Sequence, residues 1–154
     1  MDAFIDAVRQ AAQPAAVFSA GSSLALLGWV ILIFLPRRYA VLFAVPQFII
    51  PFVLGLLYAA MILPKIYTGE GGFGSIEQVR ALFQDDAALT GGWLHYLAFD
   101  LFIGAWIAAR ADTIGVPRLI QAPILLGTFM FGPVGLVLFL TMRPFFTRDN
   151  KAVE

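Results

Sequence analysis

The chain has 154 residues, of which 60% are hydrophobic and 13% are charged, and its formal net charge is zero. Soluble domains average about half apolar and about a quarter charged residues, so this composition excludes an ordinary soluble globular domain. The balanced charge gives no indication of nucleic acid as a partner. The absence of cysteine excludes disulfides, thiolate nucleophiles and cysteine-bound zinc or iron–sulfur sites.

Four apolar segments are long enough to cross a membrane, since a helix needs about 20 apolar residues to span the hydrocarbon core. We predict these spans at residues 17–35, 39–63, 87–109 and 119–142. Backbone groups in lipid must be satisfied within their own segment, and the alternating pattern of a strand is missing. The sequence therefore predicts an all-α membrane protein with four transmembrane helices in a single domain over residues 1–154.

Prolines are expected to distort two of the four spans. Pro46 and Pro51 flank Gln47 in the second span, and Gly132-Pro133 interrupts the fourth. A proline removes a backbone donor and kinks a helix, and the freed carbonyls near a polar side chain can line a cavity. We therefore predict kinked second and fourth spans, with Gln47 either lining such a cavity or simply shielded from lipid.

Two short amphipathic stretches are expected to lie on the membrane surface. One covers residues 1–13, and the other covers residues 75–84, where Ser75 and Gln78 form a capping-box signature after a glycine-rich turn. In the first span, Gly21, Ala25 and Gly28 form a stripe of small residues, which we assign to close helix packing.

The orientation in the membrane does not resolve with four spans. The side that holds both termini and the middle connection would carry six basic residues, and the other side four, concentrated in two short loops. Under the positive-inside rule, the total number of basic residues favours one side as cytoplasmic, whereas their density in the short loops favours the other.

Two ionisable side chains within the third span require an explanation. Asp100 lies near the middle of the span, where a charge costs at least about 2.5–3.5 kcal/mol and usually marks function. Apolar surroundings favour the neutral acid, which is the form that a proton donor requires. The structural alternative is a carboxyl group that accepts a hydrogen bond from Tyr96 or from a neighbouring span.

The only histidine of the chain, His95, is the second such residue. It is a candidate base, although a histidine near the membrane boundary can also be satisfied by a backbone carbonyl. Five residues separate His95 from Asp100, which is roughly 140° around a helix, so the two share no single face. Trp93 and Tyr96 do share a face with Asp100 and carry rings suited to ligand contact. A single histidine makes a haem site a poor interpretation.

The segment GWLHYLAFDLFIGAWIAARADTIGVPRL and the later FGPVGLVLFLTMR resemble the abscisic-acid-deficient-four-like family. The residues that carry this resemblance are Gly92, Trp93, His95, Tyr96, Asp100, Gly104, Asp112, Gly115, Pro117, Phe131, Gly132, Pro133, Gly135 and Arg143. The resemblance covers roughly the second half of the chain. Ala105 departs from the plant members, in which a basic or polar residue is expected, and a plastid transit peptide is missing, which suggests a member from a bacterial inner membrane.

This resemblance implies carotenoid chemistry. Plant members are linked to the conversion of violaxanthin, a 5,6-epoxide, into the allenic neoxanthin, which is an isomerisation without a redox cofactor or a metal. Opening the epoxide needs a proton donor, for which Asp100 is suited, and forming the allene needs a base, for which His95 is suited either as the base or as its orienting partner. Each role is worth about 10²–10⁴-fold in rate. The residues expected to contact a carotenoid or another polyene lipid are Trp93, Tyr96, Gln47, Trp106 and Phe99.

Two other classes of function stay open. One is a non-catalytic carotenoid-binding scaffold, in which Asp100 and His95 serve packing or anchoring. The other is a small proton-coupled carrier, because Asp and His inside a membrane also form proton relays. A carrier usually needs more spans or a homo-oligomer, and a homo-oligomer is left open here.

Overall fold

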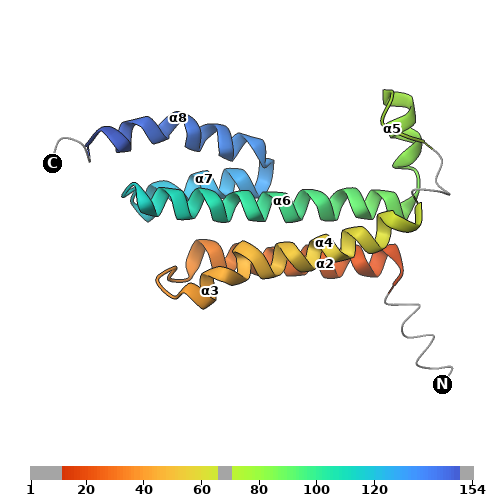
Figure 1. The fold of residues 1–154 in the computed structure, drawn as a ribbon, viewed down its shortest axis with the longest axis horizontal. Helices are drawn as coiled ribbons and strands as arrows, with labels where there is room; N and C mark the ends of the chain where they lie inside the picture. Colours follow the sequence, from red (N-terminus) through yellow and green to blue (C-terminus); the bar gives the residue numbers. More distant parts are fainter. Residues whose placement is uncertain (1–11, 66–70, 150–154) are drawn as a thin grey trace, which may run out of the picture. The chain divides into compact units, whose positions relative to one another are not determined.

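The computed structural model describes residues 12–65 and 71–149 of the chain (Figure 1). The prediction of an all-α protein is confirmed, since no strand occurs in these two ranges. The helices, in chain order, are α2 (Pro14–Phe34), α3 (Ala40–Ala44), the π-helical turn η1 (Val45–Ile49), α4 (Ile50–Ile62), the 3-10 turn η2 (Leu63–Lys65), α5 (Ile76–Leu82), α6 (Asp86–Thr113), α7 (Arg118–Phe131) and α8 (Pro133–Asp149).

Three helical stretches are long and apolar enough to cross a membrane: α2 with 21 residues, Ala40–Lys65 with 26 and α6 with 28. They correspond to the first three predicted spans and make this a membrane protein. Around Gln47, where the sequence predicts a kink, the second stretch contains the π-helical turn η1, in which Ile50 N–H bonds to the carbonyl of Val45.

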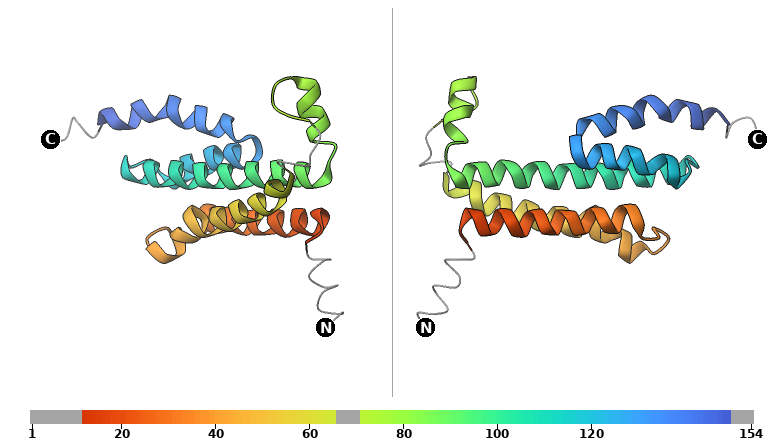
Figure 2. Two further views of the ribbon diagram at one scale, coloured as in Figure 1. Left: turned by 45° about the vertical axis from the view of Figure 1, so that its right-hand side comes forward. Right: turned by 180° about the vertical axis from the view of Figure 1, so that it is seen from behind.

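The fourth predicted span, residues 119–142, is wrong as a single helix. It forms α7 and α8, which are separated at Gly132 with φ +46° and ψ −95°. A positive φ suits glycine, and Pro133 then fits the first position of α8 because that position needs no N–H donor. Figure 2 shows α8 folding back along α7, so the Gly-Pro pair makes a turn and not a kink.

The two helices of this hairpin approach each other at backbone distance. A Cβ atom added to Gly135 would lie 2.6 Å from the Cα atom of Thr128, and closer still to the amide nitrogen and Oγ1 of Thr128. Thr128 is fully buried and its hydroxyl donates to the carbonyl of Ile124 at 2.9 Å. The glycine is therefore what allows α8 to pack against α7.

The chain divides into two compact units, which are described separately. The first unit comprises Met1–Ala25 and Phe52–Ala98. In it, Gly21 of α2 lies directly against Leu94 of α6, and Leu54 of α4 lies 3.5 Å from the position of a Cβ on the same glycine. Ala25 is almost completely buried. These contacts agree with the predicted packing role of the small-residue stripe.

The second unit comprises Leu26–Pro51 and Phe99–Glu154. Gly28 lies against Leu101, since a Cβ there would come within 2.5 Å of Leu101 Cδ2, and Gly104 accommodates the ring of Trp29 in the same way. Trp29 also makes an edge contact with the ring of Phe129 of α7, at 5.5 Å between centroids. Glycines thus mark the close contacts of both units.

A partly buried polar cluster joins the ends of three helices in the second unit. The guanidinium of Arg37 donates to Asp112 Oδ2 at 2.8 Å, to Gln121 Oε1 at 2.7 Å and to the carbonyl of Ala108 at 3.0 Å. The amide of Gln121 donates to Asp112 Oδ1 at 2.8 Å and to the carbonyl of Val116 at 2.7 Å. The cluster fixes the loop after α2 to the connection between α6 and α7.

The sequence also predicts two short amphipathic helices on the membrane surface. For residues 75–84, the structure has α5, and Ser75 caps it by accepting a hydrogen bond from the amide of Gln78 at 3.3 Å. Whether α5 lies on the membrane stays a prediction. The other amphipathic stretch, residues 1–13, lies almost entirely outside the described residues.

Candidate functional site

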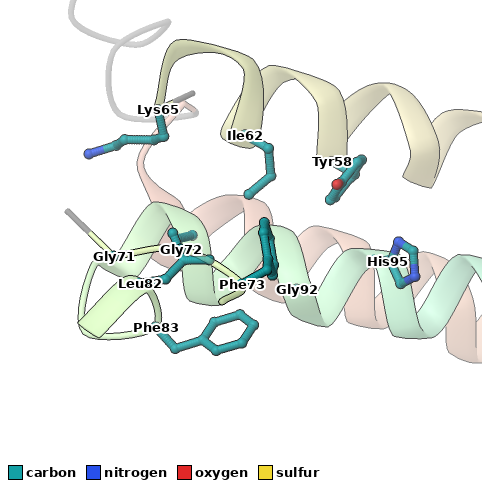
Figure 3. A pocket seen from close by; sticks show the side chains of 11 residues that line it. Tyr58, Ile62, Lys65, Gly71, Gly72, Phe73, Leu82, Phe83, Gly92 and His95 are labelled. Carbon is teal, nitrogen blue, oxygen red and sulfur yellow. The ribbon is translucent and has the colours of Figure 1, made fainter. Parts of the chain in front are cut away.

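A pocket of about 450 Å³ in the first unit contains His95 (Figure 3). Its volume lies within the range of roughly 300–1,000 Å³ that is typical of small-molecule sites. Its walls come from α4, η2, the loop before α5, the end of α5 and the first half of α6. The lining residues are Tyr58, Ile62, Lys65, Gly71, Gly72, Phe73, Leu82, Phe83, Ala88, Gly92 and His95.

The helical walls of the pocket follow from residue spacing. Ala88, Gly92 and His95 occupy positions i, i+4 and i+7 of α6, which lie on one face of a helix. Ala88 and Gly92 carry little or no side chain, so the space next to α6 stays open. The residues Tyr58 and Ile62 repeat the i, i+4 spacing on α4 and form the apolar wall.

A glycine-rich loop closes the pocket next to α5. Gly71 has φ +100°, and a Cβ there would lie within 2.6 Å of the backbone of α5, so glycine is required. The amide of Gly72 donates to the carbonyl of Gln78 at 3.2 Å, and that of Gly74 donates to Gln78 Oε1 at 3.0 Å. These bonds hold the intervening Phe73 at the pocket wall.

An ion pair lies at the end of the pocket away from His95 (Figure 3). Lys65 Nζ is 2.5 Å from Asp85 Oδ2, and Asp85 Oδ1 accepts hydrogen bonds from the amides of Ala87 and Ala88, both at 3.0 Å. The hydrogen bond from Lys65, followed by the bond from Ala88, holds the pKa of Asp85 below its usual value. The pocket thus has a charged end and an end with an imidazole.

At the other end, the ring of His95 lies beside the ring of Tyr58, with 5.6 Å between centroids and 57° between ring planes. His95 is exposed on the surface of its helix. An imidazole is a common general base in enzymes, so the pocket offers a candidate base next to an apolar space.

The other predicted residues of the first unit form an aromatic stack that does not line this pocket. Trp93 stacks on Phe18 of α2 at 5.6 Å and on Tyr96 at 5.5 Å between ring centroids. The indole Nε1–H donates to the hydroxyl of Ser22 at 2.9 Å. The stack joins α6 to α2, and a role of Trp93 and Tyr96 in substrate binding stays a prediction.

Asp100 belongs to the second unit, where its carboxyl group lies against the turn between α7 and α8. A Cβ on Gly132 would be 2.6 Å from Asp100 Oδ1 and 2.9 Å from Oδ2. The carboxyl group, whose Oδ2 is buried, therefore contacts the backbone at the point where α8 begins. The structure does not place Asp100 in the pocket of His95.

The three remaining predicted residues are spread over the second unit. Gln47 lies half-buried in η1, next to the buried Pro46. Trp106 makes an edge contact with Phe139 of α8, at 5.7 Å between centroids and 85° between planes. Phe99 is 58% exposed and has the exposure of a lipid-facing side chain.

Three residues line the pocket without having been predicted from the sequence: Tyr58, Lys65 and Phe83. The spacing of Tyr58, Ile62 and Lys65, at i, i+4 and i+7, was a usable signal for one face of α4. Nothing local, however, shows that the loop before α5 folds over this face.

Comparison with known proteins adds one match. No curated protein and no solved structure matches the chain. The model of the ABA DEFICIENT 4-like family matches residues 16–139, which is most of the chain and includes both His95 and Asp100. The protein with this pocket and this membrane-spanning helix pattern belongs to the ABA DEFICIENT 4-like family.

Proposed function

We propose that the protein is an integral membrane enzyme that isomerises the end group of a carotenoid or a related polyene, in the manner of neoxanthin synthase. The single observation that carries the proposal is the pocket that places an imidazole beside an apolar space, in a chain of this family. The proposed membrane is the inner membrane of a bacterium, where the substrate polyene dissolves.

The pocket has the size for one end of such a substrate and not for all of it. A carotenoid is a rigid rod about as long as the bilayer core is thick, about 30 Å. A volume of about 450 Å³ accommodates a ring and its nearest polyene carbons. The rest of the polyene would then lie along the apolar surface of the helices, where many large side chains, among them Phe52 and Phe99, are exposed.

The proposed reaction transfers protons only. One C–O bond of an epoxide breaks and its oxygen takes up a proton, while a polyene carbon loses a proton and the electron pair of that C–H bond forms the new double bond. The product has the mass of the substrate, and no electron donor or acceptor is consumed. His95 serves as the base, and Asp100 serves as the proton donor.

The position of Asp100 in the second unit bears on this assignment. On α6, His95 and Asp100 are five residues apart, which is about 7.5 Å along the helix axis. A structural role of Asp100 at the turn of the α7–α8 hairpin is the competing explanation, and the two roles respond differently to substitution.

The experiment measures binding and conversion separately. The purified protein in mild detergent is incubated with violaxanthin, and the bound and converted pigments are identified by absorption spectrum and mass spectrometry. We expect wild type to yield an isomer of equal mass, with His95→Gln and Asp100→Asn binding pigment but slowed by about 100-fold or more. The variant Ala88→Leu, which fills the pocket, should lose binding.

Each alternative result has a definite meaning. A wild-type protein that retains a polyene but never changes it overturns the enzyme and favours a carotenoid-binding scaffold. A protein that neither binds nor converts any of several carotenoids overturns both the enzyme and the scaffold, and favours a carrier. If Asp100→Asn converts normally while its thermal stability falls, then Asp100 supports the hairpin and is not the proton donor.

A further inference from the structure

The α7–α8 hairpin is too short in each limb to cross a membrane. The helix α7 has 14 residues and rises about 21 Å, and the apolar part of α8, residues 133–142, rises about 15 Å before Arg143. The hydrocarbon core is about 30 Å thick. Each limb therefore reaches about half to two thirds of the way through the core.

The turn of the hairpin meets α6 halfway along its length. Gly132 lies against the carboxyl group of Asp100, and Asp100 is nearly central in α6, which runs from Asp86 to Thr113. From Asp100 to either end of α6 is about 20 Å. Since α6 crosses the membrane, the turn at Gly132 lies near the middle of the bilayer, in agreement with the lengths of the two limbs.

We propose that α7 and α8 form a re-entrant hairpin, which enters the membrane and returns to the side from which it came. Backbone that departs from a regular helix at this depth is tolerated where protein covers it, and here Gly132 is buried and Asp100 packs on it. The chain then crosses the membrane three times. The C-terminus lies on the same side as residues 35–39 and 114–117, opposite to the N-terminus.

This topology resolves the orientation that four spans leave open. On the side of the C-terminus lie seven of the ten basic residues: Arg37, Arg38, Arg110, Arg118, Arg143, Arg148 and Lys151. The opposite side has three basic residues, Arg9, Lys65 and Arg80, together with six of the ten acidic residues. Under the positive-inside rule the side of the C-terminus is cytoplasmic.

The orientation assigns the pocket to one leaflet. The loop from Gly71 to Phe73 and Leu82 belong to the connection between the second and third spans, and Lys65 ends the second span. This topology places all of them on the non-cytoplasmic side. A polyene end group, if the proposed function holds, enters from the outer leaflet. The topology itself is independent of that function, so either can fail without the other.

Single cysteines test the topology directly, because the chain has none of its own. Three variants of the full chain, each with one exposed or terminal position replaced, report on which side of the membrane that position lies. They are Gln84→Cys between α5 and α6, Thr113→Cys at the end of α6, and Glu154→Cys at the C-terminus. Each variant is produced in bacteria, and spheroplasts prepared from these cells are treated with a membrane-impermeant maleimide before and after permeabilisation.

We expect Gln84→Cys to react in intact spheroplasts, and Thr113→Cys and Glu154→Cys to react only after permeabilisation. Glu154→Cys that reacts together with Gln84→Cys, and apart from Thr113→Cys, means four spans and overturns the hairpin. The reverse pattern for all three keeps the hairpin and overturns the orientation. Labelling of every position before permeabilisation indicates mixed insertion and overturns a single orientation.

Discussion

Replacing Gly135 by alanine should separate the two helices of the hairpin. The added Cβ would lie 2.6 Å from the Cα of Thr128, whereas carbon atoms pack best at about 3.5–4.0 Å. The overlap is therefore about 1 Å, and it involves backbone atoms, which cannot rotate out of the way. Overpacking of this kind costs typically about 1–3 kcal/mol.

A gain offsets part of this cost, because alanine favours a helix interior over glycine by about 0.5–1 kcal/mol. The net expectation for Gly135→Ala is a loss of about 0–2.5 kcal/mol in the free energy of unfolding. Removing the Thr128 hydroxyl in the double variant with Thr128→Ala should recover only part of it, since the backbone contact stays. The assay is unfolding in mixed micelles of dodecyl sulfate and a mild detergent.

The matched control is Gly55→Ala in α4, where a new Cβ meets no atom within 4 Å. This variant gains helix propensity without any steric overlap. Its free energy of unfolding should therefore equal that of wild type or exceed it by up to about 1 kcal/mol. If Gly135→Ala proves as stable as Gly55→Ala, the close approach of α7 and α8 is refuted, and the half-membrane hairpin loses its structural basis.

Two further predictions concern the polar groups at the membrane boundaries. Arg37→Ala should lower the free energy of unfolding by about 1–3 kcal/mol, because it leaves the buried side chain of Gln121 without its donor and removes the ion pair with the exposed Asp112. The exposed neighbour variant Arg38→Ala should leave the unfolding midpoint unchanged, and equal effects of the two would contradict the cluster. Asp85→Asn should lower the free energy of unfolding by about 0.2–1 kcal/mol near pH 7. This value is small because solvent screens the ion pair of a side chain that is 41% exposed. The folded-state pKa of Asp85 lies below its unfolded value of 3.8, so this stabilisation is present above about pH 4 and disappears as the pH falls through the folded pKa. Unfolding midpoints of wild type and variant between pH 3 and 7 should therefore converge in acid, and a constant difference would refute the assignment.

The three long helices could be predicted from the sequence because an uncharged apolar run of this length has few other solutions. The fourth span could not, since a run that crosses a membrane and a run that folds back at its middle have the same composition. The FGPVG segment predicts a break at Gly132, but the size of the turn depends on the contact of Gly135 with Thr128 and on the carboxyl group of Asp100. Those contacts join distant parts of the chain.

The candidate site could be predicted only in part, because it too depends on contacts between distant parts of the chain. His95 stood out because an ionisable residue in an apolar helix is rare. Its neighbours did not, because Tyr58 and Lys65 are ordinary residues for the end of a span, and Ala88 and Gly92 contribute to the pocket by leaving space. A pocket made by small side chains and a folded-over loop becomes visible only when the helices are placed together.

The π-helical turn at Val45–Ile49 has a consequence for how the second span can change. A π turn holds one more residue than the α-helical turn it replaces, so removing a single residue there would restore an ordinary helix. A one-residue deletion in α4, by contrast, would rotate everything after it by about 100° relative to everything before it. Ile50 packs beside Gly28 and Tyr58 faces the pocket, and both orientations depend on the phase of the helix. The second span should therefore tolerate a one-residue deletion within Val45–Ile49 better than the same deletion in α4.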